Sequence, residues 1–180
     1  MNPGSSSPEA IELSAYSPMW PVTFDIEKGR LTEIFGEGAV LIEHVGSTAV
    51  PGMGAKPIVD ILLGAPSLAI VERSIPAMVE TGYRYVPEFE RALPQRRYLV
   101  KKEGHPGYFH LHAVVYDTPF WKDLLDFRDL LRQDASYAER YWRLKNALAA
   151  RHRNDREAYA NAKSEFIKNA LAYRRGTSSG

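Results

Sequence analysis

Residues 43–63 read EHVGSTAVPGMGAKPIVDILL, and this stretch decides the fold. An apolar run over residues 39–42 precedes it and another covers residues 58–63, so the pattern predicts strand, glycine-rich turn, strand. The turn contains three glycines, two hydroxyl side chains and one lysine. A loop of this composition exposes backbone N–H groups and supplies a positive charge, which suits a phosphate group. An ordinary Gly-Ser-Thr turn without a ligand is the alternative.

Asp60 is the one acidic residue inside the second apolar run. A buried carboxylate costs free energy unless it meets a metal ion, a hydrogen-bond donor or a cation. The residue therefore either faces a phosphate-and-metal site or caps a neighbouring loop. Lys56 has two interpretations as well. It reaches a phosphate as a point charge, with its position stiffened by Pro57, or it is a solvated loop lysine.

The composition is that of a soluble globular protein: 180 residues, 44% hydrophobic and 25% charged. The net charge is +1, from 23 basic and 22 acidic residues, which gives no global electrostatic case for binding nucleic acid or a membrane. The chain has no cysteine, which excludes disulfides, thiolate catalysis and zinc–thiolate sites and fits a cytoplasmic location. No apolar run approaches the roughly 20 residues that span a bilayer.

The chain is expected to form one domain over residues 15–173. Residues 1–14 begin with a stretch rich in proline, glycine and serine, which predicts a disordered tail and lacks the pattern of a signal peptide. Residues 174–180 are expected to form a flexible C-terminal tail.

Periodicity and turn signals predict an α+β domain. A first helix begins at Pro21, and the two strands around the glycine loop follow it. A helix over residues 68–79 and strands over 83–86, 97–102 and 108–115 come next. Three helices end the chain, the second beginning with a capping box at Ser136 and the third capped by Asn154. This order predicts a small mixed sheet with helices on one face and a C-terminal helical cluster.

Two histidines, His110 and His112, are two residues apart in the last predicted strand, so both face the same side of the sheet. Together with Asp60 they would suit Zn²⁺, Mn²⁺ or Fe²⁺. Alternatively, the imidazoles contact phosphate or act as a general base. Glu43 and His44 point to opposite faces of their strand, so only one of them can share the face of the site.

The segment of residues 84–102 is locally basic, with six basic against two acidic side chains and a net charge of +4. Arg97 and Lys101 lie on a common face if strand alternation holds, and they could clamp a triphosphate or another anion. An ordinary solvated hairpin explains the same pattern.

Residues 42–52, followed by residues 55–61, closely resemble the signature of the GrpB family. Further segments fit the pattern of the family, and the resemblance covers residues 15–171. These segments are residues 16–20, 110–112 and 127–132, Tyr141, residues 144–145 and residues 163–167.

The GrpB family is in turn similar to the nucleotidyltransferase superfamily of the polymerase-β type. The resemblance implies that Gly46 and Ser47, with Thr48 beside them, support nucleotide phosphates. It also implies that Asp60 is the first of two carboxylates that hold Mg²⁺. The second carboxylate would fall at position 62, where this chain has leucine.

The function implied by this resemblance is binding of an ATP-like nucleotide or another phosphorylated small molecule. If the protein is an enzyme, it would transfer a nucleotidyl group with the help of a divalent metal ion. That ion would be Mg²⁺ or Mn²⁺, or a transition metal bound by Asp60, His110 and His112. Leu62 favours one alternative, a regulatory module that binds nucleotide without catalysis. The other alternative is a metal-dependent hydrolase that uses the same aspartate and histidines.

Overall fold

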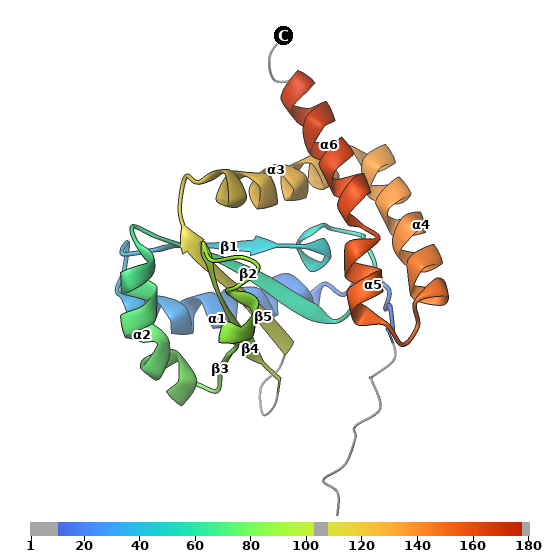
Figure 1. Cartoon of the computed structure of the whole chain (residues 1–180). Coiled ribbons are helices and arrows are strands. Elements are labelled where there is room, and N and C mark those ends of the chain that lie inside the picture. The colour runs from blue at the N-terminus through green and yellow to red at the C-terminus, as the bar shows by residue number, and fades with distance from the viewer. Residues whose placement is uncertain (1–10, 103–107, 178–180) are drawn as a thin grey trace, which may run out of the picture.

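The computed structural model describes residues 11–102 and 108–177, and the ribbon is shown in Figure 1. Its elements follow the predicted order, with an additional break in the last helix. They are α1 Met19–Phe35, β1 Leu41–Val45, the short 3₁₀ helix η1 Ser47–Ala49, β2 Ile58–Ala65, α2 Leu68–Glu80, β3 Arg84–Tyr85, the 3₁₀ helix η2 Pro87–Phe89, β4 Arg96–Lys101, β5 Tyr108–Val115, α3 Pro119–Gln133, α4 Ala135–Arg151, α5 Arg156–Asn161 and α6 Ser164–Thr177.

The five strands form one mixed sheet in the order β1-β2-β5-β4-β3. The central strands β2 and β5 run parallel, and the other neighbouring pairs are antiparallel. In the β2–β5 register Asp60 lies beside His110 and Leu62 beside His112. The α+β class and the mixed sheet predicted from the sequence are therefore confirmed.

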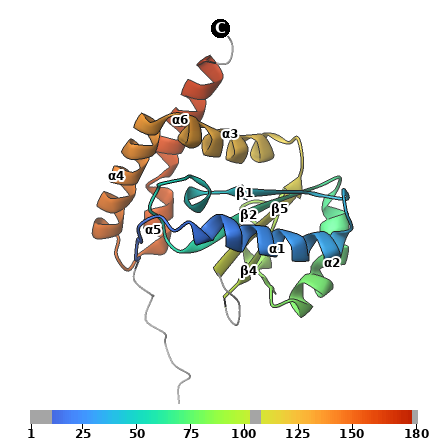
Figure 2. The ribbon, with the colours of Figure 1, turned by 180° about the vertical axis from the view of Figure 1, so that it is seen from behind.

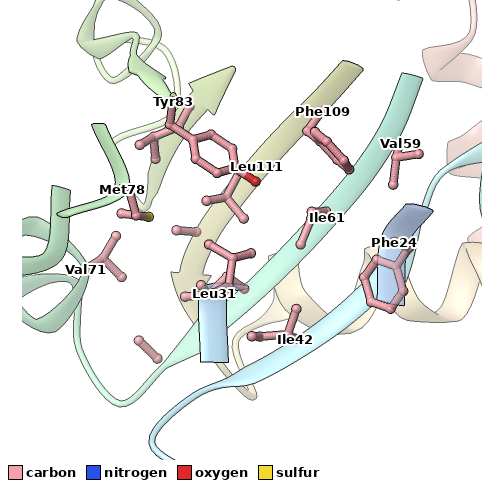
Figure 3. Packing of buried hydrophobic residues seen from close by; sticks show 14 of the residues in the cluster. Phe24, Leu31, Ile42, Val59, Ile61, Val71, Met78, Tyr83, Phe109 and Leu111 are labelled. Atoms are coloured by element: carbon pink, nitrogen blue, oxygen red, sulfur yellow. The ribbon is translucent and has the colours of Figure 1, made fainter. Parts of the chain in front are cut away.

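One face of the sheet packs against α1 and α2 and holds the main hydrophobic core (Figure 3). In β2, alternation directs Ile61 and Leu63 into this core, where both are fully buried. Leu31 of α1 and Val71 of α2 meet them there. The intervening side chains of the strand, including Asp60, consequently face the other side.

Helix α3, the first helix of the predicted C-terminal cluster, covers part of that other side, so helices flank both faces of the sheet. In Figures 1 and 2, α3 and α1 lie on opposite sides of the sheet. Leu62, Val45 and Val114 supply apolar side chains to this second face, and Trp121 of α3 packs on them. The covering helix explains why β2 reads as a nearly continuous apolar run rather than a simple alternation.

The N-caps of two C-terminal helices differ from those that the capping signals predicted: α4 begins earlier, with Asp134 in place of Ser136, and α5 begins one residue later, with Asp155 in place of Asn154. Asp134 caps α4 by accepting hydrogen bonds from the backbone of residues 136 and 137, and Asp155 caps α5 through the backbone of residue 158. A carboxylate is at least as good an N-cap as serine or asparagine, so these two acids take the position. The third predicted helix is also divided, into α5 and α6.

The boundaries of the predicted tails differ from the structure at both ends. Helix α6 continues to Thr177, and Arg174 forms an ion pair with Asp126 of α3. At the other end Ile11 is buried, and Ser14 forms a β-bridge with Ala55. The remaining residues of the predicted tails, 1–10 and 178–180, lie outside the described part of the chain.

In the described ranges, no helix combines the length and apolar character needed to cross a bilayer.

A fully buried ion pair joins α1 to β4. The Nζ atom of Lys101 lies 2.8 Å from Oε1 of Glu27, and the two side chains are 0% and 1% exposed. Arg30 forms a second ion pair with Glu27 at 3.0 Å. Both charges have lost their hydration, so each depends on the other for stabilisation.

Removing one member of this pair should therefore be strongly destabilising. We expect Lys101→Met to lower the free energy of unfolding by about 3–5 kcal/mol, because Glu27 is left buried with only part of its compensation. Urea denaturation followed by circular dichroism measures the change. Lys102→Met is the matched control, since the neighbouring lysine is exposed and its loss should cost less than about 0.5 kcal/mol. Equal effects of the two substitutions would contradict this account.

Candidate functional site

The polar side chains of the sheet gather on the face that α3 leaves partly open. Asp60, His110 and His112 lie on the neighbouring strands β2 and β5, and Tyr98 of β4 is paired with His112. The Nδ1 atom of His110 is 3.3 Å from Oδ1 of Asp60, and Nε2 of His112 is 3.7 Å from the same oxygen. The side chains of these three residues keep 19–29% of their surface exposed, so a ligand can reach them. The structure thus brings together the predicted aspartate and both histidines.

Arg96 fixes the proton on His112. Its Nη1 atom lies 3.1 Å from Nδ1 of His112. A guanidinium group only donates hydrogen bonds, so Nδ1 of the neutral imidazole accepts and the ring proton is on Nε2, facing Asp60. Arg96 also stacks over Tyr98, 4.8 Å from the ring centroid. Arg96 was not predicted as a site residue, although it belongs to the basic segment of residues 84–102.

The charge of Asp60 is held by its two imidazole neighbours. Burial alone would raise the pKa of this carboxyl, but hydrogen bonds from His110 and His112, with their charge, outweigh it and place the pKa well below the usual range. Burial lowers the pKa of His112, although its hydrogen bond to Asp60 opposes the shift. The site consequently presents an ionised carboxylate.

The glycine loop packs directly on this carboxylate. Gly46 has φ 73°, and a Cβ atom built there would lie 2.4 Å from Oδ2 of Asp60. Only glycine combines this backbone conformation with so close an approach. Ser47 follows it, and its side chain hydrogen-bonds Tyr141 of α4. The structure therefore places both residues of the Gly-Ser pair at the aspartate.

Thr48 does not face the site, which corrects its predicted part in phosphate binding. It is buried, its hydroxyl donates to the carbonyl of Ile58 at 3.2 Å, and it accepts from Nε2 of His44 at 3.0 Å. The ring of His44 stacks on Phe24 in the core, with centroids 4.8 Å apart. Both side chains hold the loop in place rather than opening toward a ligand. Glu43 points the opposite way from His44, to the face of the sheet that carries Asp60 and α3. Its Oε2 atom lies 2.6 Å from Nη1 of Arg128.

Three lysines, which we call the lysine cluster, approach the glycine loop: Lys56, Lys145 and Lys163. The Nζ atoms of Lys56 and Lys163 lie 4.4 and 4.3 Å from the ring centroid of Tyr159. Lys145 is buried and donates to the carbonyl of Gly54 at 2.6 Å. Burial, reinforced by the charge of Lys163, lowers the pKa of Lys145 to about 7.

Lys163 connects the lysine cluster to the carboxylate. Burial lowers the pKa of this lysine, and the charge of Asp60 opposes the shift, so the two groups are within electrostatic range. Of the lysine cluster, only Lys56 was selected as a candidate from the sequence. The other two had one signal, their agreement with the family pattern at residues 144–145 and 163–167.

Arg97 and Lys101 lie on the opposite face of the sheet, and this corrects the prediction that they clamp an anion at the site. They do share a face, but it is the face covered by α1 and α2. Arg97 forms ion pairs with Glu72 at 2.7 Å and with Glu90 at 3.4 Å, and Lys101 is paired with Glu27. The neighbouring Arg96 takes the position toward the histidines.

The donor set does not fit a pair of Mg²⁺ ions. Position 62, where a second carboxylate would stand, is a fully buried leucine beneath Trp121. Both nitrogens of His112 are engaged, one with Arg96 and one toward Asp60. Within the described ranges, no three histidine, cysteine, aspartate or glutamate side chains are arranged to hold a metal ion. Hard cations need several oxygen ligands, whereas Asp60 supplies two oxygens beside the histidines and Glu43, on the same face, is paired with Arg128.

Comparison with known proteins places this α+β domain, with its mixed sheet flanked by helices, in a family. The family model described as GrpB protein matches residues 10–173, and the chain belongs to the GrpB family.

Two relatives and one solved structure illustrate the similarity. The UPF0157 protein YqkA of Bacillus subtilis is 37% identical over 160 residues, which are 89% of this chain and 46% of YqkA, so the chain spans about half of that relative. The glutamate-rich protein GrpB of Alkalihalophilus pseudofirmus is 34% identical over 88% of this chain and 92% of its own length. The crystal structure of the conserved protein GrpB from Enterococcus faecalis superposes with a TM-score of 0.81 at 31% identity, covering 94% of this chain and all of that one.

Because Gly46 packs on Asp60, we expect a single methyl group added at position 46 to lower the stability of the fold strongly. Gly46→Ala should lower the free energy of unfolding by roughly 3 kcal/mol, from backbone strain together with the clash at the carboxylate. Gly52→Ala is the matched control, because Gly52 has a similar φ of 77° but no atom within 4 Å of its built Cβ. It should cost roughly 1–2 kcal/mol, the strain alone. Chemical denaturation of both variants isolates the contact, and equal losses would show that it is unimportant.

Stability should fall as pH is lowered from 7 to 5. Burial lowers the pKa of His44 from 6.5 to about 4, with Asp60 opposing the shift and Arg132 and Arg128 reinforcing it. Between these two values the unfolded chain binds the proton and the folded chain does not, so acid favours unfolding.

For His44 alone we expect a loss of about 2 kcal/mol over this pH interval, and His112 acts in the same direction. The depressed pKa of Asp60 adds its own loss only below about pH 4. Urea denaturation at both pH values measures the effect. His44→Gln should reduce the pH dependence, whereas His152→Gln should leave it intact. A wild-type stability that is flat over this interval would refute the assignment.

Proposed function

We propose that the protein binds a phosphorylated small molecule of the nucleotide type between the Asp60 face of the sheet and the C-terminal helices. The phosphate lies against the glycine loop and the lysine cluster. The GrpB fold is then used in the manner of the nucleotidyltransferase superfamily, with the Gly-Ser pair at the phosphate.

The observation that carries this proposal is that Lys163 acts electrostatically both on Asp60 and on Lys145, which donates to the carbonyl of Gly54 in the glycine loop. The mutual repulsion of the two lysines contributes to the lowered pKa of Lys145. Among the described residues, no carboxylate lies within ion-pair distance of either lysine, and Asp60 acts on Lys163 only at longer range. Two partly buried like charges are stabilised by a bound anion, and a phosphate carries the required charge.

Asp60 and its histidines supply the chemistry of the proposed site. Asp60 orients His110 through its contact with Nδ1, and Nε2 of that imidazole can accept a proton from an acceptor hydroxyl or from water. Arg96 keeps His112 in the tautomer that donates toward Asp60. This arrangement supports attack of an acceptor hydroxyl on the α-phosphorus of a nucleoside triphosphate, which forms the new O–P bond, breaks the bond between the α-phosphorus and the bridging oxygen and releases pyrophosphate. The predicted divalent metal remains a prediction, and no step is assigned to it.

Leu62 favours a second candidate, a binding or regulatory module without transferase activity. The side chain is completely buried under α3, so the second carboxylate of the superfamily pattern has no counterpart there. Both candidates require the same ligand, and they differ only in turnover. The predicted hydrolase requires a bound transition metal in addition.

The binding test is a thermal-shift panel of nucleoside triphosphates and inorganic phosphate, each with and without Mg²⁺, Mn²⁺ or Zn²⁺. A ligand at one hundred times its dissociation constant adds about 2.7 kcal/mol, or roughly 5–10 °C for a chain of this size. We expect such a shift with a nucleotide in the wild type and its loss in Lys163→Gln. Lys168→Gln is the control, because it removes an exposed lysine from helix α6, which begins directly after Lys163.

Three outcomes separate the alternatives. A shift that survives in Lys163→Gln, or no shift with any phosphorylated compound, overturns the proposed binding site. A shift with a transition metal alone favours the hydrolase. Asp60→Asn should still bind nucleotide but lose any transfer or hydrolysis, and a bound nucleotide that is never turned over favours the regulatory module.

A further inference from the structure

A groove of about 720 Å³ lies between the glycine loop and the helices α3 and α4. It is bounded by loop residues 50–53, by the end of α3 and by the first half of α4. Neither Asp60 nor either histidine of the sheet lines it, so it is separate from the site described above. Its size is that of a pocket for a small organic molecule.

The walls of the groove are mainly apolar. Val50 and Met53 come from the loop, Leu131 from α3 and Trp142 from α4. The first three are buried, whereas Trp142 is only half-buried and presents its indole to the groove. Such a surface suits the apolar or aromatic body of a ligand.

One charged group, Arg132, stands on these walls without a counter-ion among the described residues. Its Nε atom donates to the carbonyl of Ala49 at 2.8 Å, which orients the guanidinium. The two carboxylates that act on it electrostatically, Asp129 and Glu43, are both held by Arg128, at 2.7 and 2.6 Å.

The acid on the groove wall is already neutralised. Glu139 forms an ion pair with Arg143, four residues further along α4. The remaining charge in the groove is therefore positive, fixed in orientation and next to apolar side chains. A guanidinium in this position offers its two terminal nitrogens to a planar carboxylate.

We propose that this groove binds a small molecule that combines an apolar or aromatic body with one carboxylate group. The body lies between Trp142, Leu131 and Met53, and the carboxylate meets Arg132. The proposal is independent of the phosphate site, because the two surfaces share no side chain. A carboxylic acid bound here would contact residues 50–53 of the loop whose Gly46 packs on Asp60.

The test compares 1-naphthoate with its neutral isostere 1-naphthamide by isothermal titration calorimetry. In the wild type we expect naphthoate to bind about tenfold more tightly, the preference of a charge-assisted pair over a neutral one. Arg132→Met should abolish the preference, and Arg132→Lys should keep part of it. Arg73→Met is the matched control, because it removes an exposed arginine of α2 and should leave the preference unchanged.

Amide chemical-shift mapping on the wild-type protein locates the bound probe. This measurement does not depend on whether the Arg132 variants fold. Shifts from naphthoate should concentrate in the amides of Val50, Gly52 and Met53, in those of residues 131–133 and in the indole N–H of Trp142. Equal affinity for acid and amide, a preference that persists in Arg132→Met, shifts confined to another surface, or no binding of either probe would each overturn the proposal. The nucleotide panel uses other residues and other ligands, so failure there leaves this result unaffected.

Discussion

The contact between the backbone of Gly46 and the carboxylate of Asp60 is the constraint on which the rest of the site depends. It brings the glycine loop onto the one acidic side chain of the central strand β2, at a distance that no Cβ atom would permit. The two histidines of β5 lie on the other side of the same carboxylate. A group enclosed in this way is costly unless it is compensated, and hydrogen bonds from both imidazoles supply the compensation. Position 46 is thereby restricted to glycine and the strand register to one alignment.

Side chains on the core side of the same loop hold it in place. The sequence did not distinguish these side chains from side chains that bind a ligand. Thr48 was interpreted as part of the phosphate loop, but its hydroxyl joins His44 to the start of β2. Hydroxyl and imidazole groups are equally suited to binding a ligand and to satisfying buried backbone, and composition does not separate the two uses. Which use applies depends on the face of the strand, and the face depends on tertiary packing.

Strand alternation explains both the success and the failure of the sequence predictions at the site. It placed His110 and His112 on one face with Asp60, and the parallel register of β2 and β5 brings them together. The same rule correctly placed Arg97 and Lys101 on a common face. The period of two does not say which face of β4 is covered, and a shift of one residue exchanges Arg97 for Arg96. The contribution of α4 and of the residue just before α6 was also beyond local patterns, because Lys145 and Lys163 are distant in sequence from Gly54 and Asp60, on which they respectively act.

Leucine at position 62 is required by the packing of helix α3 on the second face of the sheet. Helix α3 closes one end of the second face by seating Trp121 against Leu62, Val45 and Val114. A carboxylate at position 62 would be buried in that apolar contact without a cation or donor, at a cost of several kcal/mol. Covering the sheet with α3 therefore excludes a second acid next to Asp60. Any chemistry of this face must begin from one carboxylate and two imidazoles, with the positive charge supplied by lysines of the loop and the C-terminal helices.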